Sequence, residues 1–431
     1  MSSHQVAIIG TGYVGLTTGA CLAHLGHNVV CVDNDEHKLE MIRGGVLPIK
    51  EDGLDDLVSM GMERKTLQFT TSLKDAVANA EFVFLCLPTP SKPDGSADTS
   101  SIESVVLQIR DSLKVGTVVV NKSTVPISSA SVIQVILNRS DVYVVSNPEF
   151  LREGTAVKDF LEPDRIVVGF DHPDAGLRVA DLYKPVDRPV VLTDSVSAET
   201  IKYFANAYLA MRISFINEVA MFCSLVDADV FEVIRGLSHD SRIGSTFLSP
   251  GPGWGGSCFP KDTRAITFGA RQLGSQLSLI EAAIEANSSH QERIVEMICE
   301  KLGESSTDEK VALLGLAFKA GTDDVRESPA LLIARELADR GYRVVAYDPA
   351  NPKLPAELAI ETAESVLDAL WNADLAIVAT EWSEFSDIPA AAFRTTMRGN
   401  IIFDLRYILD PLDFTSEGLE IISIGRRISS N

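Results

Sequence analysis

Paired cysteines, an excess of positive charge and long apolar runs are all missing from this sequence of 431 residues. Its six cysteines are scattered without a CxxC spacing, which excludes a disulfide scaffold and a thiolate zinc site. Acidic residues outnumber basic ones by 60 to 38, and the formal net charge of −22 argues against binding to nucleic acid or to an anionic membrane. No uninterrupted apolar run reaches the roughly 18 residues that span a bilayer, and Met1–Gln5 lacks the parts of a signal peptide. We therefore predict a reduced, cytoplasmic protein without a metal site.

The composition that is present is typical of a globular protein with more than one domain. Hydrophobic residues make up 45% of the chain and charged residues 23%. A chain of 431 residues is too long for a single ordinary core. Changes in pattern along the sequence predict three domains, which cover residues 1–195, 196–305 and 306–431.

Short β-branched runs alternate with helical patterns in the first domain. The predicted strands are Gln5–Ile9, Val29–Val32, Phe82–Leu87, Val118–Val120, Val142–Val145 and Ile166–Val168. They are apolar without alternation, as parallel strands that are buried on both faces are. The pattern therefore predicts a doubly wound sheet with helices on both sides.

The second domain is predicted to be helical and the third to be a smaller doubly wound domain. Ser197 is the expected cap of a long helix that runs to about Leu225, and a second helix covers about Leu277–Leu302 and ends at Gly303. Residues 304–309 form a polar linker. The third domain has an expected helix at Pro329–Arg340 and expected strands at Lys310–Leu314, Val344–Tyr347, Leu375–Ala379 and Ile401–Phe403. The fold class is α/β, with two Rossmann-like domains joined by a central all-helical domain.

A glycine turn after the first strand predicts a dinucleotide site. Gly10 permits the tight turn, Gly12 lets a pyrophosphate approach, and Gly15 allows the helix to pack on the strand. The amino end of that helix offers N–H groups to the phosphates. Asp33 follows the second strand, where its carboxylate accepts the ribose hydroxyls and repels a 2′-phosphate, which favours NAD over NADP. A glycine turn that binds nothing is the competing interpretation.

A reactive thiol is suggested by the segment Gly255–Asp262, which places Cys258 between paired glycines and a Lys-Asp pair. Glycines let the backbone approach a ligand closely, and an ammonium near the sulfur favours the nucleophilic thiolate. A buried structural cysteine beside a surface Lys261–Asp262 pair is the alternative.

Polar residues also follow the predicted strands at the carboxyl edge of the sheet, where this fold binds ligands. They are Thr89, Ser123–Pro126 and Asn147–Glu149, with Glu153 four residues further on. Each taken alone is equally well explained as a helix cap or a turn. Lys202 and Asn206 lie one turn apart on the long helix, and for Lys202 a snorkelling side chain remains the alternative.

These motifs occur in an order that resembles the UDP-glucose/GDP-mannose dehydrogenase family almost from end to end. They are Gly10-x-Gly12-x-x-Gly15, Lys122–Pro126, Asn147–Gly154, Lys202-x-x-x-Asn206, Gly255–Asp262, and Phe318-Lys319 followed by Asp324-x-Arg326-Glu327-Ser328. Cys258–Asp262 most resembles the branch that acts on UDP-glucose. The resemblance implies NAD-dependent, four-electron oxidation of the C6 alcohol of UDP-glucose to UDP-glucuronate, through a thiohemiacetal and a thioester on Cys258.

The resemblance also implies a role for each site residue. Lys202 and Asn206 stabilise the oxyanion, Asp262 and Thr124 position water, and Glu153 is the general base in thioester hydrolysis. Further residues assigned to NAD are Tyr13, Val14, Lys38, Thr89, Lys261 and Arg326, beside Thr124 and Glu153. The residues assigned to the substrate are Glu149, Phe150, Leu151, Lys202, Asn206, Arg242, Gly255, Cys258, Phe318, Lys319 and Arg406.

Lys319 and Arg406 are the cations expected for the anionic substrate, because a chain of net charge −22 must attract it locally. Arg242 resembles an arginine that family members contribute from the neighbouring subunit, which fits a homodimer or a larger homo-oligomer. A solvated ion pair is the alternative for each arginine. The competing functions are a dehydrogenase for GDP-mannose or a UDP-N-acetylhexosamine, a two-electron β-hydroxyacid dehydrogenase, and a nonenzymatic nucleotide sensor.

Overall fold

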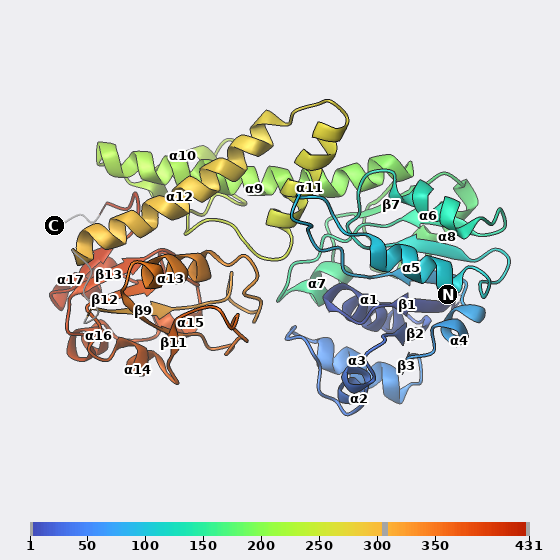
Figure 1. Cartoon of the computed structure of the whole chain (residues 1–431), viewed down its shortest axis with the longest axis horizontal. Helices are drawn as coiled ribbons and strands as arrows, with labels where there is room; N and C mark the ends of the chain where they lie inside the picture. The colour runs from blue at the N-terminus through green and yellow to red at the C-terminus, as the bar shows by residue number, and fades with distance from the viewer. Residues whose placement is uncertain (1–2, 304–308, 428–431) are drawn as a thin grey trace. The chain divides into compact units, whose positions relative to one another are not determined.

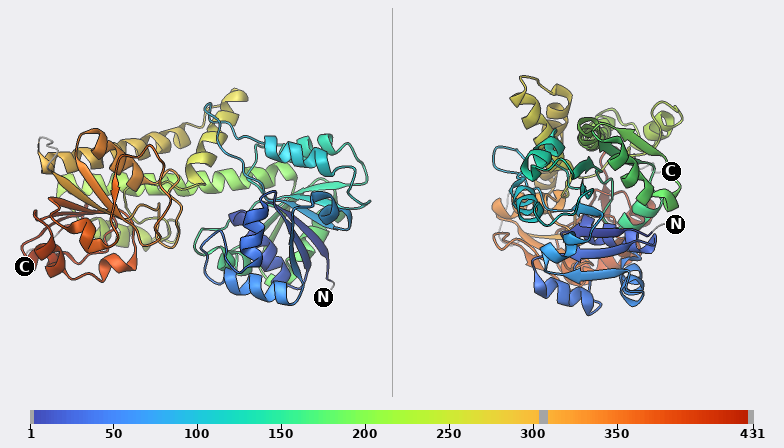
Figure 2. Two further views of the ribbon diagram at one scale, coloured as in Figure 1. Left: turned by 60° about the horizontal axis from the view of Figure 1, so that its bottom comes forward. Right: turned by 90° about the vertical axis from the view of Figure 1, so that its right-hand side faces the viewer.

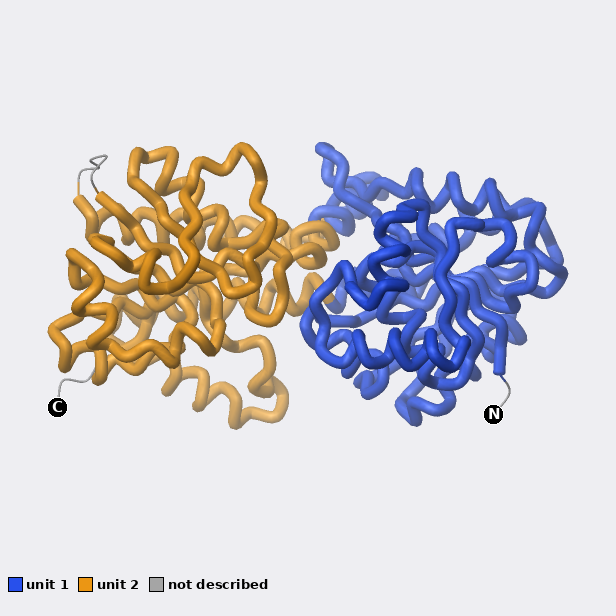
Figure 3. Tube along the Cα trace, turned by 90° about the horizontal axis from the view of Figure 1, so that it is seen from below, with its two compact units in different colours: residues 1–205, 264–275 blue, residues 206–263, 276–431 orange. Residues whose placement is uncertain are grey.

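The computed structural model of the protein describes residues 3–303 and 309–427. These residues form two compact units (Figure 3), one of residues 1–205 with 264–275 and one of residues 206–263 with 276–431. Two helices, α9 (Ser195–Val226) and α11 (Phe259–Gln272), contribute residues to both units. The predicted polar linker at 304–309 falls almost wholly outside the described residues.

The first unit is built on an eight-stranded sheet with the order β3-β2-β1-β4-β5-β6-β7-β8. Its strands are β1 (Gln5–Ile9), β2 (Asn28–Val32), β3 (Leu67–Thr70), β4 (Phe82–Leu85), β5 (Val118–Asn121), β6 (Tyr143–Ser146), β7 (Ile166–Phe170) and β8 (Val190–Thr193). Neighbouring strands pair in parallel, except that β6 and β7 are antiparallel. The doubly wound sheet is confirmed, whereas β3 and β8 were not predicted.

Helices cover both faces of this sheet (Figures 1 and 2). The side chains of β1 alternate between two separate apolar cores, because Val6 and Ile8 point into one and Ala7 and Ile9 into the other. This burial on both faces is the reason that the strands lack a polar alternation. The helices of the unit are α1 (Tyr13–His24), α2 (Glu36–Arg43), α3 (Leu54–Glu63), α4 (Leu73–Ala78), α5 (Ser100–Ile109), α6 (Ser129–Leu137), α7 (Ala156–Leu161) and α8 (Pro173–Leu182).

The middle of the chain is helical, as predicted, with α9, α10 (Val230–Ser238), α11 and α12 (Ser278–Leu302). The predicted cap of α9 is wrong by three residues, because the helix begins at Ser195 and Asp194 precedes it. The carboxylate of Asp194 accepts a bond from the Ser197 backbone N–H at 2.8 Å, so an aspartate performs the capping that was expected of the serine. Gly303, with a φ of +86°, ends α12 as predicted.

Helix α9 has an unusually apolar composition. By length and hydropathy it meets the criteria for crossing a bilayer, and one third of its most apolar window is buried. This property was not predicted from the sequence, because charged residues such as Lys202 and Arg212 interrupt the apolar run. The buried side of α9 takes part in the core of the second unit through Ala220 and Cys223.

The second unit contains a six-stranded parallel sheet with the order β11-β10-β9-β12-β13-β14. Its strands are β9 (Lys310–Leu314), β10 (Arg343–Tyr347), β11 (Glu361–Thr362), β12 (Leu375–Val378), β13 (Ile401–Asp404) and β14 (Glu420–Ile422). The accompanying helices are α13 (Pro329–Asp339), α14 (Val366–Leu370), α15 (Ser383–Ser386), α16 (Ala390–Thr396) and α17 (Pro411–Ser416). Alternate residues of β9 again enter two cores, so this domain repeats the layered plan of the first.

The turn after β9 keeps only part of the glycine motif that follows β1. Gly315 is retained with a φ of +95°, but Ala317 stands where the second glycine would be. The carboxylate of Asp348, which follows β10, accepts bonds from the N–H groups of Leu316 and Ala317 at 2.7 and 3.0 Å. The Trp382 indole N–H donates to the same oxygen at 3.3 Å. This carboxylate is therefore engaged by its own domain.

Candidate active site

Of the three glycines in the turn after β1, only Gly12 has free space beside its Cα. A Cβ added to Gly10, which has a φ of +96°, would lie 2.4 Å from the Cys86 carbonyl oxygen, and one added to Gly15 would lie 1.9 Å from the Gly10 carbonyl oxygen. A Cβ on Gly12 would meet nothing within 4 Å. The first and third glycines are thus required by packing, whereas the space at Gly12 and the amino end of α1 fit a pyrophosphate.

Asp33 lies beside this turn and is held in its ionised form. Its Oδ2 accepts bonds from the Thr11 N–H at 2.9 Å, the Thr11 hydroxyl at 2.6 Å and the Lys38 ammonium at 2.8 Å. Partial burial alone raises the pKa of Asp33, but these donors outweigh burial and lower it to about 2. Two residues that were assigned to the cofactor, Asp33 and Lys38, are therefore brought together next to the glycine turn.

A buried ion pair occupies the carboxyl edge of the first sheet. The Lys202 ammonium lies 2.7 Å from Glu149 Oε1, and the two side chains are only 4% and 7% exposed. Burial by itself raises the pKa of Glu149, but the charge and the hydrogen bond of Lys202 outweigh burial and hold it below its usual value. Snorkelling to solvent is excluded for Lys202, because its ammonium is buried. The centre of the Phe150 ring lies 3.6 Å from the guanidinium carbon of Arg165 and 5.4 Å from the ammonium nitrogen of Lys202.

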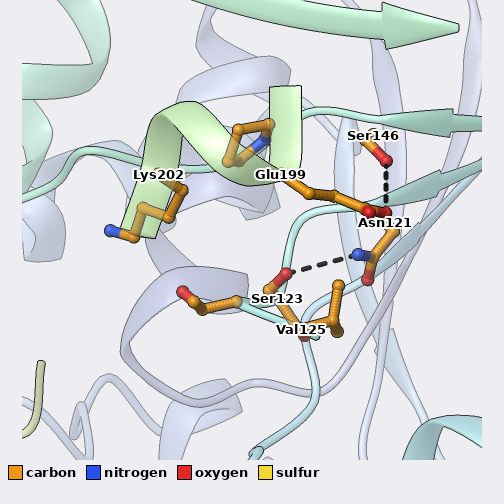
Figure 4. A pocket seen from close by; sticks show the side chains of 8 residues that line it. Asn121, Ser123, Val125, Ser146, Glu199 and Lys202 are labelled. Atoms are coloured by element: carbon orange, nitrogen blue, oxygen red, sulfur yellow. Dashed lines mark hydrogen bonds between the residues drawn. The ribbon is translucent and has the colours of Figure 1, made fainter. Parts of the chain in front are cut away.

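A small cavity beside Lys202 is lined by the polar residues that follow β5 and β6 (Figure 4). Its lining residues are Asn121, Ser123, Thr124, Val125, Ser146, Pro148, Glu199 and Lys202. The Thr89 hydroxyl donates to the Thr124 carbonyl at 2.7 Å and ties the ends of β4 and β5 together. Of the predicted strand-end residues, Ser123, Thr124, Val125 and Pro148 thus line one cavity of the first unit, and Thr89 bonds to Thr124.

Two buried ionisable residues at this edge were missed by the sequence analysis. Glu199 accepts bonds from the Ser128 and Ala130 N–H groups and lines the cavity, and burial raises its pKa. The Lys122 ammonium donates to Asn147 Oδ1 at 3.1 Å, and burial lowers its pKa to about 8. Lys122 lies within the identified motif Lys122–Pro126 and Glu199 lies near the start of the predicted long helix, but only the tertiary contacts reveal that both are buried.

In the second unit, Cys258 immediately precedes α11, at the helix end where N–H groups point outward. Its carbonyl accepts the Asp262 N–H at 2.9 Å, and its sulfur lies 3.6 Å from the Ser257 hydroxyl. The buried Asp262 carboxylate accepts the Asn206 amide at 2.6 Å and the Lys261 ammonium at 2.5 Å. The structure therefore joins three predicted residues, Asn206, Lys261 and Asp262, directly.

Paired glycines let the thiol loop pack tightly within its own unit. A Cβ on Gly255 would lie 2.0 Å from the Glu327 carbonyl oxygen, and one on Gly256, with a φ of +81°, would lie 2.9 Å from the Phe318 ring. The Gly256 N–H also donates to the Arg326 carbonyl. These glycines fix the loop on the segment that carries Phe318 and Arg326.

The cationic side chains that were assigned to the substrate or the cofactor differ in their burial and in the groups that they contact. The partly buried Arg406 donates to the Ala379 and Phe318 carbonyls, both at 2.9 Å, and pairs with Glu381. Arg242 and Arg326 are exposed and pair with Asp240 and Asp324, respectively. The Lys319 ammonium lies 5.5 Å from the Phe318 ring.

The chain is similar to known proteins along most of its length. Residues 4–187, 196–289 and 312–411 match the NAD binding, central and UDP binding domains of the UDP-glucose/GDP-mannose dehydrogenase family. This chain belongs to that family. A UDP-glucose 6-dehydrogenase of Rhizobium meliloti is 41% identical over 98% of this chain and 99% of its own length. UDP-glucose 6-dehydrogenase YwqF of Bacillus subtilis is 40% identical over 98% of each chain. The structure of a UDP-glucose dehydrogenase from Pyrobaculum islandicum matches with a TM-score of 0.91 and 34% identity, covering 99% of this chain and 98% of that one.

Membership of the UDP-glucose/GDP-mannose dehydrogenase family confirms the resemblance, the fold class and NAD as the cofactor. The predicted site residues divide between the two units. The first unit holds the glycine turn, Asp33, Lys38, Thr89, Thr124, Glu149, Phe150, Leu151, Glu153 and Lys202. The second holds Asn206, Arg242, Gly255, Cys258, Lys261, Asp262, Phe318, Lys319, Arg326 and Arg406. Their individual roles stay predictions.

Proposed function

We propose that this protein is a UDP-glucose 6-dehydrogenase that oxidises the C6 alcohol of its substrate to a carboxylate in two steps. One alcohol, two NAD⁺ and one water give one carboxylate, two NADH and three protons. The observation that carries the proposal is the presence of a thiol at the amino end of α11 in a chain about 40% identical to UDP-glucose 6-dehydrogenases over its length. A two-electron dehydrogenase has no use for that thiol.

In the first oxidation, C6 would lose a hydride to NAD held at the glycine turn, and a base would take the hydroxyl proton. The Lys202 ammonium would stabilise the negative charge on the C6 oxygen, and Asn206 would donate a further hydrogen bond. Glu149 keeps Lys202 charged and directed, because their buried pair at 2.7 Å favours the ionised form of each. Arranged donors of this kind contribute roughly 3 to 4 kcal/mol each in comparable sites.

Cys258 retains the aldehyde between the two oxidations. Its thiolate adds to the C6 carbonyl carbon, and the carbonyl oxygen takes up a proton to give a thiohemiacetal. Loss of a second hydride and a proton from that group leaves a thioester. Glu153 then removes a proton from water as the water attacks C6, the carbon–sulfur bond breaks, and Cys258 leaves as the thiolate. Asp262 and Thr124 would hold the water in place.

Substrate recognition is assigned to the third of the predicted domains, residues 306–431. Its match to the UDP binding domain supports contacts between the diphosphate and the cations Lys319 and Arg406. Arg406 is held in place by the Ala379 and Phe318 carbonyls, and such support orients a guanidinium toward a ligand. The proposed protein has three domains, with boundaries at residues 195 and 305, and is located in the cytoplasm.

A homodimer is supported by the exposed face of α9. Five large apolar side chains on this helix, each between 41% and 60% exposed, follow each other at intervals of four and seven residues: Phe204, Tyr208, Phe215, Phe222 and Val226. That spacing forms one stripe along a helix and fits packing against a second copy of the same helix. Arg242 is the residue proposed to reach the neighbouring subunit. Sedimentation of Phe215→Glu beside the wild type tests the dimer, and an unchanged assembly contradicts this interface.

The decisive assay is the yield of NADH per product for a panel of sugar nucleotides. UDP-glucose is expected to give two NADH per UDP-glucuronate and to be preferred over GDP-mannose and UDP-N-acetylglucosamine. A yield of one NADH would indicate a simple two-electron dehydrogenase and would refute the proposal. Preference for GDP-mannose would retain the chemistry and change the substrate. Tight binding of NAD without turnover would identify a sensor.

A further inference from the structure

A buried carboxylate that the mechanism does not use lies between the cofactor turn and the loop of the proposed base. Glu51 precedes α3 and is only 6% exposed. Its Oε2 accepts the Tyr13 hydroxyl and, at 2.7 Å, the Gly154 N–H, while Oε1 lies 3.5 Å from the Val157 N–H. Tyr13 is the first residue of α1, and Gly154 directly follows Glu153.

The Tyr13 hydroxyl completes a closed set of contacts. It also lies 2.6 Å from the Gly154 nitrogen, so that one N–H is shared between the hydroxyl oxygen and the Glu51 carboxylate. Gly154 has a φ of +82°, a backbone conformation that favours glycine and sets the direction of this N–H. All the residues involved belong to the first unit. The cofactor turn and the Glu153 loop are thus joined through two side chains.

These contacts are strong for a physical reason. Hydrogen bonds to an ionised carboxylate are roughly twice as strong as neutral ones, and a buried carboxylate that loses its donors is costly. Burial, followed by the bond to Glu51, raises the pKa of Tyr13 well above its usual range, so its hydroxyl stays a donor. The Tyr13 hydroxyl donates to Glu51, and the assignment of Tyr13 to the NAD site stays a prediction.

We propose that Glu51 and Tyr13 form a clamp that positions Glu153. The clamp couples the loop that carries Glu153 and Gly154 to the glycine turn that binds the dinucleotide. The inference rests on the proposed function, because it assigns the clamp to the step in which Glu153 activates water. Neither Glu51 nor Tyr13 exchanges protons with the substrate, so both are positioning residues. A loosened clamp slows thioester hydrolysis while the first hydride transfer continues, and the acyl group then accumulates on Cys258.

The competing explanation is that Glu51 only stabilises the fold, since its bond to Val157 also caps the start of α7. A purely structural residue affects both oxidation steps and the melting temperature together. A clamp changes the partition between them, because only the hydrolytic step depends on Glu153. The ratio of trapped thioester to NADH therefore separates the two explanations.

The experiment mixes each enzyme with UDP-glucose and saturating NAD and follows NADH by absorbance and the Cys258 adduct by intact-protein mass spectrometry. The clamp variants are Tyr13→Phe and Glu51→Gln, and Glu153→Gln is the reference for a missing base. Matched controls are Tyr143→Phe and Glu81→Gln, which lie at the amino ends of β6 and β4, at the sheet edge opposite the glycine turn. In both clamp variants, hydrolysis is expected to slow by about tenfold or more, and in Glu51→Gln the early NADH phase is expected to stay close to wild type.

A second readout needs no turnover. Hydrogen–deuterium exchange of residues 150–157 is expected to slow when NAD binds to the wild type and both controls, and to respond less in Tyr13→Phe. If the clamp variants match the controls both in the amount of Cys258 adduct and in hydrogen–deuterium exchange, the clamp proposal is wrong. An absence of adduct in Glu153→Gln, or of carboxylate from the wild type, instead overturns the proposed function and the hydrolytic role. In that case the exchange response alone decides whether the clamp exists.

Discussion

Replacing Lys202 by methionine should separate the structural and chemical contributions of its pair with Glu149. The charges lie 2.7 Å apart and are almost fully buried, so their attraction is about 6 kcal/mol at an effective dielectric constant of about 20. Much of this offsets the cost of burying them, but removing one partner leaves the other uncompensated and costs roughly 3 to 5 kcal/mol. We therefore expect Lys202→Met and Glu149→Gln each to lose about this much stability at pH 7, and the double variant to lose less than their sum.

The pH dependence gives this prediction a sign. In the wild type the pKa of Glu149 is lowered, so its contribution to stability is present above the pKa of the unfolded chain and is lost as pH falls. In Lys202→Met burial instead raises that pKa, so the deficit relative to wild type should shrink as pH falls toward 4 and Glu149 is protonated. Guanidinium unfolding followed by circular dichroism from pH 4 to 8 measures both effects, with the exposed Lys158→Met as the control. Additive losses, or a deficit that is independent of pH, would refute the buried-pair argument.

Catalysis should fall in the single Lys202→Met variant and in the double variant alike. Loss of one oxyanion donor reduces turnover by roughly 100- to 1000-fold. Because the double variant is expected to recover stability, its activity shows the combined chemical contribution of Lys202 and Glu149 without a folding defect. Wild-type turnover in a well-folded double variant would remove Lys202 from the mechanism.

Three further predictions concern single residues. Cys258→Ser should retain slow first-step oxidation and lose carboxylate formation, as product analysis by chromatography will show; full carboxylate yield would disprove covalent capture. Asp33→Ala should weaken NAD binding by roughly 1 to 3 kcal/mol and relax the rejection of NADP, as measured by calorimetric titration; unchanged affinity for both dinucleotides would contradict the ribose role. The pKa of Lys122 falls from 10.5 to about 8 on folding, so between these pH values only the unfolded chain keeps the proton. Stability relative to Lys122→Met should therefore rise by roughly 3 kcal/mol from pH 8 to 10.5, and a flat difference would contradict the effect of burial.

The sequence was sufficient where local pattern determines structure. Buried parallel strands are uniformly apolar, and glycine spacing reports a tight turn, so β1, Gly10 and the doubly wound sheet were predicted correctly. Strand β8 escaped because it lies at the edge of the sheet, where it has one neighbour and its side chains are half exposed. The cap of α9 was misplaced because aspartate and serine compete for that position within three residues.

The site was predictable in its motifs and not in its contacts. Lys202 was recognised as a candidate, but the pairing that settles its burial comes from Glu149, 53 residues away in the sequence. Glu51 meets Gly154 across 103 residues, and no local spacing links them. Such contacts depend on how crossovers return each strand to one sheet edge, which a single sequence does not encode in any short window.

The altered turn after β9 has a consequence for the order of events. A methyl group occupies the place of the second glycine, no helix starts at that turn among the described residues, and Asp348 is saturated by Leu316, Ala317 and Trp382. In the part of the chain that the structure describes, the domain built on β9 thus lacks the second glycine and the following helix with which the turn after β1 is predicted to bind a dinucleotide. If the proposed reaction consumes two NAD molecules, both have to use the site at the first glycine turn, and the first NADH has to leave before the second NAD binds. In the proposed mechanism, the bond to Cys258 and the contacts to the nucleotide would hold the aldehyde-level sugar during that exchange.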